Sequence, residues 1–122
     1  MDKQKITAVF GSSVKPNRYS NRAINKLRQY GYPVHALGLR EGKVADVEIK
    51  TGMPKLDDVH TVTMYLGPQN QVEYFDYIRS MKPHRVIFNP GTENPKFAKI
   101  LKNEGVEVVE YCTLVLLDSD MF

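Results

Sequence analysis

Short apolar runs alternate with segments of helical spacing along most of the chain. The apolar runs have the β-branched and aromatic content of buried strands; they are KITAVF (5–10), YPVHALGL (32–39), TVTMYLG (61–67), RVIFNPG (85–91) and VEVVEY (106–111). Between the first two runs, apolar residues recur at helical spacing, with Ser20 as the expected N-cap and Gly31 as the C-terminal stop. The pattern predicts a strand, a loop, a helix and a second strand.

Residues typical of helix ends predict two later helices. Asn70, with Glu73 three residues later, resembles a capping box ahead of an apolar stripe. Asn94 is expected to cap the next helix, with Pro95 in its first position and Gly105 at its end. Each helix lies between two apolar runs, so strands and helices alternate.

The segment 40–58 is polar and rich in turn residues, so one short strand, at 47–49, is expected there, and the last apolar run, 113–117, is expected to dock on the sheet. Strands that alternate with helices imply right-handed crossovers and a mainly parallel sheet covered on both faces. The sequence therefore predicts one α/β domain over residues 1–122, a Rossmann-type three-layer sandwich with strand order 3-2-1-4-5-6.

Composition narrows the class of protein. The chain has 122 residues, 42% of them apolar, which suits one core, and no apolar stretch approaches the roughly 20 residues of a membrane span. The single cysteine, Cys112, forms no internal disulfide, so we expect a cytoplasmic protein. The net charge of +3 is spread along the chain and does not indicate nucleic-acid binding.

The turn GSSVKPNRYSNRA (11–23) carries the most unusual chemistry. Gly11 lets the backbone approach a ligand, and the amides ahead of the first helix form an anion site. Ser12, Ser13 and Ser20 offer hydroxyl groups, and Arg18 offers a forked donor to a phosphate. The alternative is an ordinary open turn, which favours the same residue types.

Two common nucleotide motifs are absent. Only Gly11 of the three glycines of G-x-G-x-x-G is present, and no G-K-[ST] follows it. The second predicted strand ends at Gly38, Leu39 and Arg40, where an NAD site would have an acid. A basic residue there suits a ribose that carries a phosphate, as in NADP or coenzyme A; a solvated arginine is the alternative.

The first turn also matches a longer pattern, G-x-S-x-x-P-x-R-x-S, through Gly11, Ser13, Pro16, Arg18 and Ser20. The Pro90–Gly91 turn, Glu93 and the late Cys112 follow it. With these features the chain, from Ile6 to about Cys112, resembles the small single-domain CoA-binding proteins, which share their fold with the CoA-binding domain of succinyl-CoA synthetase. It differs from them after the second strand, where the family usually has Asn-Pro.

The resemblance implies noncovalent binding of a small-molecule nucleotide, coenzyme A or an acyl-CoA, without a metal. The first turn would hold the pyrophosphate, residues 39–40 the adenosine and its 3′-phosphate, residues 66–68 the ribose side, and residues 90–92 the pantetheine exit. The expected site residues are Gly11, Ser12, Ser13, Pro16, Arg18, Ser20, Leu39, Arg40, Leu66, Gly67, Pro68, Pro90, Gly91 and Thr92.

No catalytic residue is assigned. The three histidines are expected to be structural, Cys112 is either a buried cysteine or a contact of the pantetheine arm, and Glu93 is either a base or a favourable acid at a helix start. Two other functions stay open: an NADP-linked oxidoreductase or acyl-CoA-processing enzyme, and a protein-interaction domain that has lost nucleotide binding. A homodimer is a further expectation.

Overall fold

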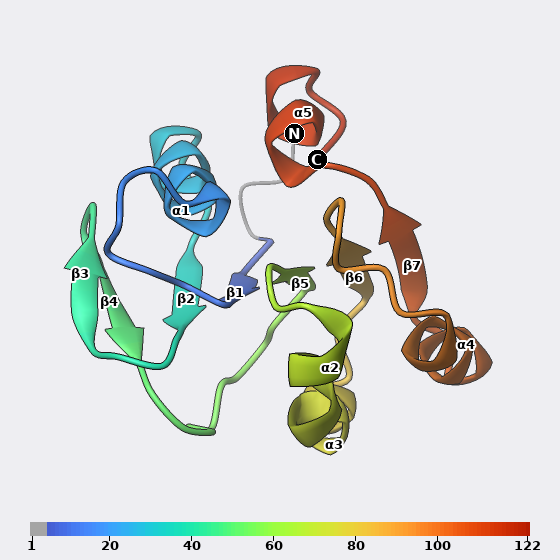
Figure 1. Ribbon diagram of the computed structural model, residues 1–122. Helices are drawn as coiled ribbons and strands as arrows, with labels where there is room; N and C mark the ends of the chain where they lie inside the picture. The colour runs from blue at the N-terminus through green and yellow to red at the C-terminus, as the bar shows by residue number, and fades with distance from the viewer. Residues whose placement is uncertain (1–4) are drawn as a thin grey trace.

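The computed structural model describes residues 5–122 and contains a sheet with helices on both faces (Figure 1). The strands are β1 (Thr7–Phe10), β2 (Val34–Leu37), β3 (Gly42–Val44), β4 (Val47–Lys50), β5 (Thr61–Met64), β6 (Arg85–Phe88) and β7 (Glu107–Glu110). The helices are α1 (Tyr19–Gln29), α2 (Pro68–Gln71), the 3₁₀ turn η1 (Val72–Tyr74), α3 (Phe75–Ser80), α4 (Pro95–Asn103) and α5 (Thr113–Asp118). The predicted α/β architecture is confirmed.

The strands of this sheet lie in the order β3-β4-β2-β1-β5-β6-β7. The six predicted strands occupy the predicted order, and all pairs among them are parallel. The difference in detail is β3, an edge strand that pairs antiparallel with β4 and was not predicted. Its turn passes through Ala45 at φ 55°, a left-handed conformation that alanine rarely takes. The Asn-Gly or Asp-Gly pair that usually marks such a hairpin turn is absent, so the sequence did not predict it.

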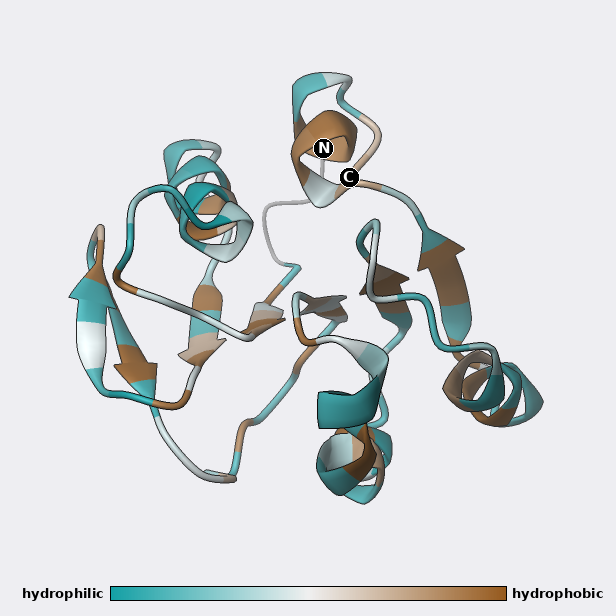
Figure 2. Ribbon diagram, in the orientation of Figure 1, coloured by the Kyte–Doolittle hydropathy of each residue, from teal (hydrophilic) through white to brown (hydrophobic). Residues whose placement is uncertain are grey.

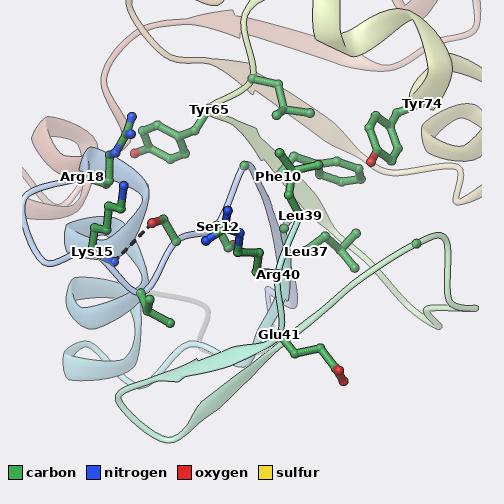
Figure 3. A pocket seen from close by; sticks show the side chains of 16 residues that line it. Phe10, Ser12, Lys15, Arg18, Leu37, Leu39, Arg40, Glu41, Tyr65 and Tyr74 are labelled. Atoms are coloured by element: carbon green, nitrogen blue, oxygen red, sulfur yellow. Dashed lines mark hydrogen bonds between the residues drawn. The ribbon is translucent and has the colours of Figure 1, made fainter.

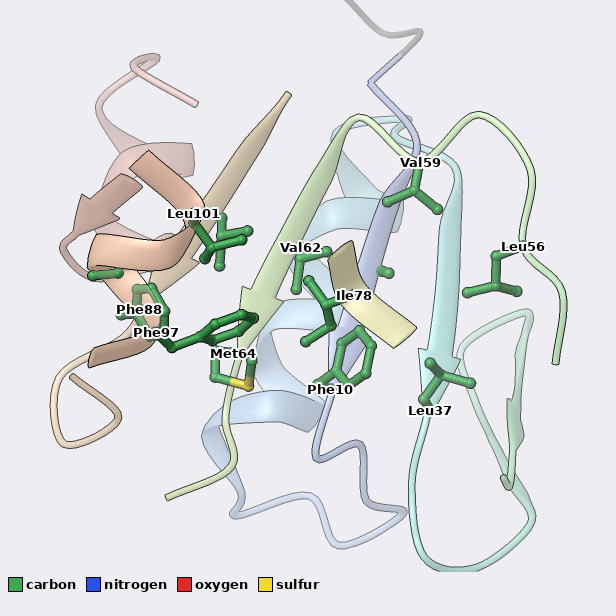
Figure 4. Packing of buried hydrophobic residues seen from close by; sticks show 13 residues of the cluster. Phe10, Leu37, Leu56, Val59, Val62, Met64, Ile78, Phe88, Phe97 and Leu101 are labelled. Carbon is green, nitrogen blue, oxygen red and sulfur yellow. The ribbon is translucent and has the colours of Figure 1, made fainter. Parts of the chain in front are cut away.

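The core consists of two apolar clusters, one on each face of the sheet. Successive residues of β1 contribute to opposite clusters: Val9 packs with Ile24 of α1, and Phe10 packs with Ile78 of α3 (Figure 4). Hydrophobic colour accordingly concentrates in the strands, and much of α1 is hydrophilic (Figure 2). Because both faces are covered, every residue of the central strands β1, β5 and β6 is buried, whereas β4 nearer the edge alternates buried and exposed residues.

Helix α1 begins two residues earlier than expected. Arg18 is its N-cap, with φ −78° and ψ 142°, so Ser20 lies inside the first turn and its predicted role as the cap is wrong. The side chain of Asn21 donates to the Ser13 carbonyl at 2.9 Å and ties the helix back to the preceding loop. The predicted stop is confirmed, since Gly31 has φ 88° directly after the helix.

The segment after β5 also differs from the prediction. Helix α2 starts at Pro68 with Gly67 as its N-cap, so the expected capping role of Asn70 is wrong. Proline fits the first helical position because that position needs no amide donor. The backbone then tightens into η1 before α3 begins, and Val72 of the expected apolar stripe is 62% exposed.

The last third of the chain follows the prediction more closely. The Asn94 side chain accepts a hydrogen bond from the Phe97 amide at 3.1 Å and caps α4, and Gly105 follows that helix at φ 82°. The terminal apolar run forms helix α5, whose Leu116 and Leu117 pack into the same cluster as α1. Across residues 5–122, no helix has the length and apolar character needed to cross a bilayer.

Candidate functional site

The candidate site lies at the carboxyl end of β1, the point in the sheet from which the strand order runs in opposite directions. Strand β1 pairs with β2 on one side and β5 on the other, and ligands of open α/β sheets bind at such a point. A cavity of about 380 Å³ opens there (Figure 3). It is lined by Phe10, Gly11, Ser12, Ser13, Val14, Lys15, Arg18, Leu37, Gly38, Leu39, Arg40, Glu41, Gly52, Tyr65, Leu66 and Tyr74.

The backbone of the first turn is tied to β2. Gly11 has φ 84°, and a Cβ atom there would lie 3.0 Å from the Tyr65 carbonyl carbon, so a larger residue would be strained and crowded. The amides of Gly11 and Ser12 both donate to the Leu37 carbonyl, at 3.1 and 2.9 Å. These two amides are therefore engaged within the protein, and donors for an anion have to come from later in the turn.

The serines of the turn have different surroundings. The buried Ser12 hydroxyl donates to the Val9 carbonyl at 2.9 Å, which braces the turn from inside. The Ser13 hydroxyl oxygen accepts the Lys15 amide at 3.1 Å and leaves its own hydrogen for another partner. Ser20 is buried in the first turn of α1 and does not line the cavity.

Three cationic side chains, Lys15, Arg18 and Arg40, are exposed and line the cavity. Within the described part of the chain, none of the three has a carboxylate at ion-pair distance, whereas other arginines do form ion pairs. Glu41 also lines the cavity, but its side chain extends away from Arg18 (Figure 3). The site therefore presents uncompensated positive charge to a ligand.

Aromatic rings border the cavity on two sides, with Tyr65 nearer Arg18 and with Phe10 and Tyr74 farther from it (Figure 3). On one side is Tyr65, where burial raises the pKa of the phenol to about 12 and the nearby Thr113 hydroxyl opposes the rise. On the other side, Phe10 and Tyr74 form an edge-to-face pair with ring centroids 5.7 Å apart. The walls can thus contact the apolar or planar parts of a ligand whose anionic groups meet the cations.

About half of the expected site residues come together here. Those that line the cavity are Gly11, Ser12, Ser13, Arg18, Leu39, Arg40 and Leu66; those that do not are Pro16, Ser20, Gly67, Pro68, Pro90, Gly91 and Thr92. Gly67 and Pro68 are used to start α2. Thr92 is buried, its hydroxyl donates to the Asn89 carbonyl, and its carbonyl accepts from the Gln71 side chain.

Sequence reasoning missed several lining residues. Lys15 stands inside the quoted turn, and a search of that turn for every cation would have found it. Tyr65 and Tyr74 lie far along the chain from the first turn, and no motif around them indicates that their side chains line the same cavity as Gly11.

The other chemically notable residues lie outside the cavity. The Glu93 carboxylate accepts the Gly91 amide at 2.9 Å, and the half-buried Cys112 is the N-cap of α5. His60 and His84 stack with ring centroids 4.8 Å apart at the opposite edge of the sheet. Among the described residues, no three His, Cys, Asp or Glu side chains gather as a metal site.

Comparison with known proteins adds to this geometry. The model of a CoA binding domain family matches residues 5–118. No curated protein sequence matches the chain. A crystal structure of an uncharacterized protein is 41% identical, covers 98% of both chains and superimposes with a TM-score of 0.94.

Two more distant structures share the fold. Cell-free ID.343 from Thermus thermophilus is 22% identical, with 98% of this chain and 92% of that chain covered and a TM-score of 0.86. A hypothetical protein from Pyrococcus horikoshii OT3 is 22% identical, with 95% and 83% covered and a TM-score of 0.85. At this level of identity the likeness concerns the fold.

Proposed function

Because this chain belongs to the CoA binding domain family, we propose that it binds coenzyme A or an acyl-CoA noncovalently in the cavity at the end of β1. One observation supports this most directly: Arg18 and Arg40 come from two separate loops to the same cavity, and neither has an acidic partner within residues 5–122. Coenzyme A carries a pyrophosphate and a separate 3′-phosphate, which two such cations match.

In this proposal the turn after β1 binds the pyrophosphate. Arg18 donates to the phosphate oxygens, and the Ser13 hydroxyl adds a donor. Ser12 supports the turn through its bond to Val9, in place of the direct donor role expected from sequence.

The loop after β2 binds the adenosine end. Leu39 is 86% exposed at the cavity, an unfavourable position for leucine unless a ligand covers it, and the adjacent Arg40 is placed for the 3′-phosphate. Leu66 lines the cavity from the β5 side. The turn at 90–92 lies outside the cavity and would touch the pantetheine arm only after the arm leaves it.

Isothermal titration of the purified protein tests the proposal, with coenzyme A, acetyl-CoA, 3′-dephospho-CoA, NADP and NAD as separate ligands. We expect micromolar binding of coenzyme A and weaker binding of 3′-dephospho-CoA. Preference for NADP, accompanied by turnover of NADPH, would favour an oxidoreductase instead. Absence of binding to all of these nucleotides would favour a protein-interaction domain.

A further inference from the structure

We propose that Lys15 is a second phosphate-binding cation of the first turn, so that the pyrophosphate lies between Lys15 and Arg18. The inference rests on the proposed function and specifies how one part of that site works. Lys15 is exposed and lines the same cavity as Arg18.

Hydrogen bonds fix the backbone that joins Lys15 to Arg18. The Arg18 amide donates to the Lys15 carbonyl at 3.1 Å, which closes a turn between them. The Lys15 amide in turn donates to the Ser13 hydroxyl oxygen at 3.1 Å, and the Ser13 carbonyl accepts from Asn21 of α1. The turn is therefore braced before a ligand arrives, so less ordering is required on binding.

The side chains of Lys15 and Arg18 extend to the same side of this turn, toward Tyr65 (Figure 3). Two neighbouring cations repel each other when no anion separates them. In the described part of the protein, no carboxylate lies at ion-pair distance from either. An anion with two adjacent charged groups would relieve this repulsion, and a pyrophosphate has that form.

The cavity then holds three cations for three phosphates. Lys15 and Arg18 meet the pyrophosphate, and Arg40, from the loop after β2, meets the 3′-phosphate. The ligand 3′-dephospho-CoA keeps the pyrophosphate and lacks the 3′-phosphate. Loss of a pyrophosphate contact should therefore weaken its binding, and loss of a 3′-phosphate contact should not.

Titration calorimetry of Lys15→Gln with coenzyme A and with 3′-dephospho-CoA tests the inference. We expect the affinity for both ligands to fall by the same factor, roughly tenfold, as for loss of a hydrogen bond to a charged group. Arg40→Gln is expected to weaken coenzyme A and leave 3′-dephospho-CoA unchanged. Lys55→Gln removes an equal charge from an exposed lysine outside the cavity and is the matched control.

Three results would overturn the assignment of Lys15. The first is unchanged affinity in Lys15→Gln. The second is an equal loss of affinity in Lys55→Gln, which would indicate a long-range charge effect. The third is a loss in Lys15→Gln that is confined to coenzyme A, which would assign Lys15 to the 3′-phosphate. All three presuppose that the unsubstituted protein binds coenzyme A. Absence of binding by that protein would instead remove the proposed function itself.

Discussion

The carbonyl oxygen of Ser12 lies directly against the α-carbon of Gly38, so a Cβ atom built on Gly38 would collide with it. The same Cβ atom would lie 3.0 Å from the side chain of Ile49. The Gly38 amide is fixed by a 3.0 Å hydrogen bond to the Lys50 carbonyl, so the loop after β2 has little freedom to move away. The first turn and the loop that carries Arg40 are therefore one packed unit.

We expect Gly38→Ala to lower the free energy of unfolding by about 1–3 kcal/mol, the range for added atoms in a packed site. Because the displaced Ser12 carbonyl belongs to the first turn, affinity for coenzyme A should fall as well. Urea denaturation and calorimetry measure the two effects. Wild-type stability with unchanged affinity would show that the two loops can separate without consequence.

Arg18→Ala is expected to weaken coenzyme A binding by roughly 1.5 to 3 kcal/mol, the scale of a hydrogen bond to a charged group. Arg22→Ala is the control, because Arg22 is an exposed arginine one helical turn away, over the Tyr19 ring and outside the cavity. Calorimetry on both variants compares them. Equal affinities would remove Arg18 from the site.

The two asparagines predicted as caps should differ when replaced. Asn94→Ala removes the bond to the Phe97 amide and leaves the buried Gln71 oxygen without its donor, so we expect a loss of about 1–2 kcal/mol in unfolding free energy. Asn70→Ala affects an exposed position that caps nothing and should change it by less than about 0.5 kcal/mol. Similar losses in denaturant unfolding would contradict the assigned helix starts.

Stability should fall in mild acid through His35. Burial lowers the pKa of His35 from its usual 6.5, and the charge of Lys50 lowers it further. The neutral ring stabilises the fold in full above pH 6.5, and this contribution is lost as pH falls because the unfolded chain takes up a proton first. His35→Gln should reduce the fall in unfolding free energy between about pH 7 and about pH 5. An identical fall in both proteins would count against this.

Tyr65 is expected to affect the stability of the protein at alkaline pH. Its phenol ionises near pH 10 in the unfolded chain and near pH 12 in the fold, because burial raises the pKa. The protein is therefore expected to lose stability as pH rises through this window, and Tyr65→Phe should lose less. Near neutral pH the variant should unfold at about the same denaturant concentration, since the buried Tyr65 hydroxyl has no partner in good hydrogen-bond geometry within the described residues, although the Thr113 hydroxyl lies near it. A strongly destabilised variant would show that the hydroxyl has a partner.

Local patterns predicted the elements whose formation depends on near neighbours. The caps and stops at Asn94, Gly31 and Gly105 were predicted correctly because each acts on the few residues beside it. The prediction at Asn70 was wrong because a proline two residues earlier offered a competing helix start. The terminal run was expected to dock on the sheet, but its helical form follows from packing against α1 and the sheet.

The sequence by itself determined the α/β class, the order of the six main strands and the family resemblance, because apolar runs and turn motifs encode these locally. Only the tertiary structure decided which residues share the cavity. In the folded protein the Gly11 amide donates to the Leu37 carbonyl, and Tyr65 and Tyr74 line the same cavity as the first turn. These contacts depend on how closely the loops at the ends of the paired strands approach one another, and the spacing of residues along the chain does not contain that information.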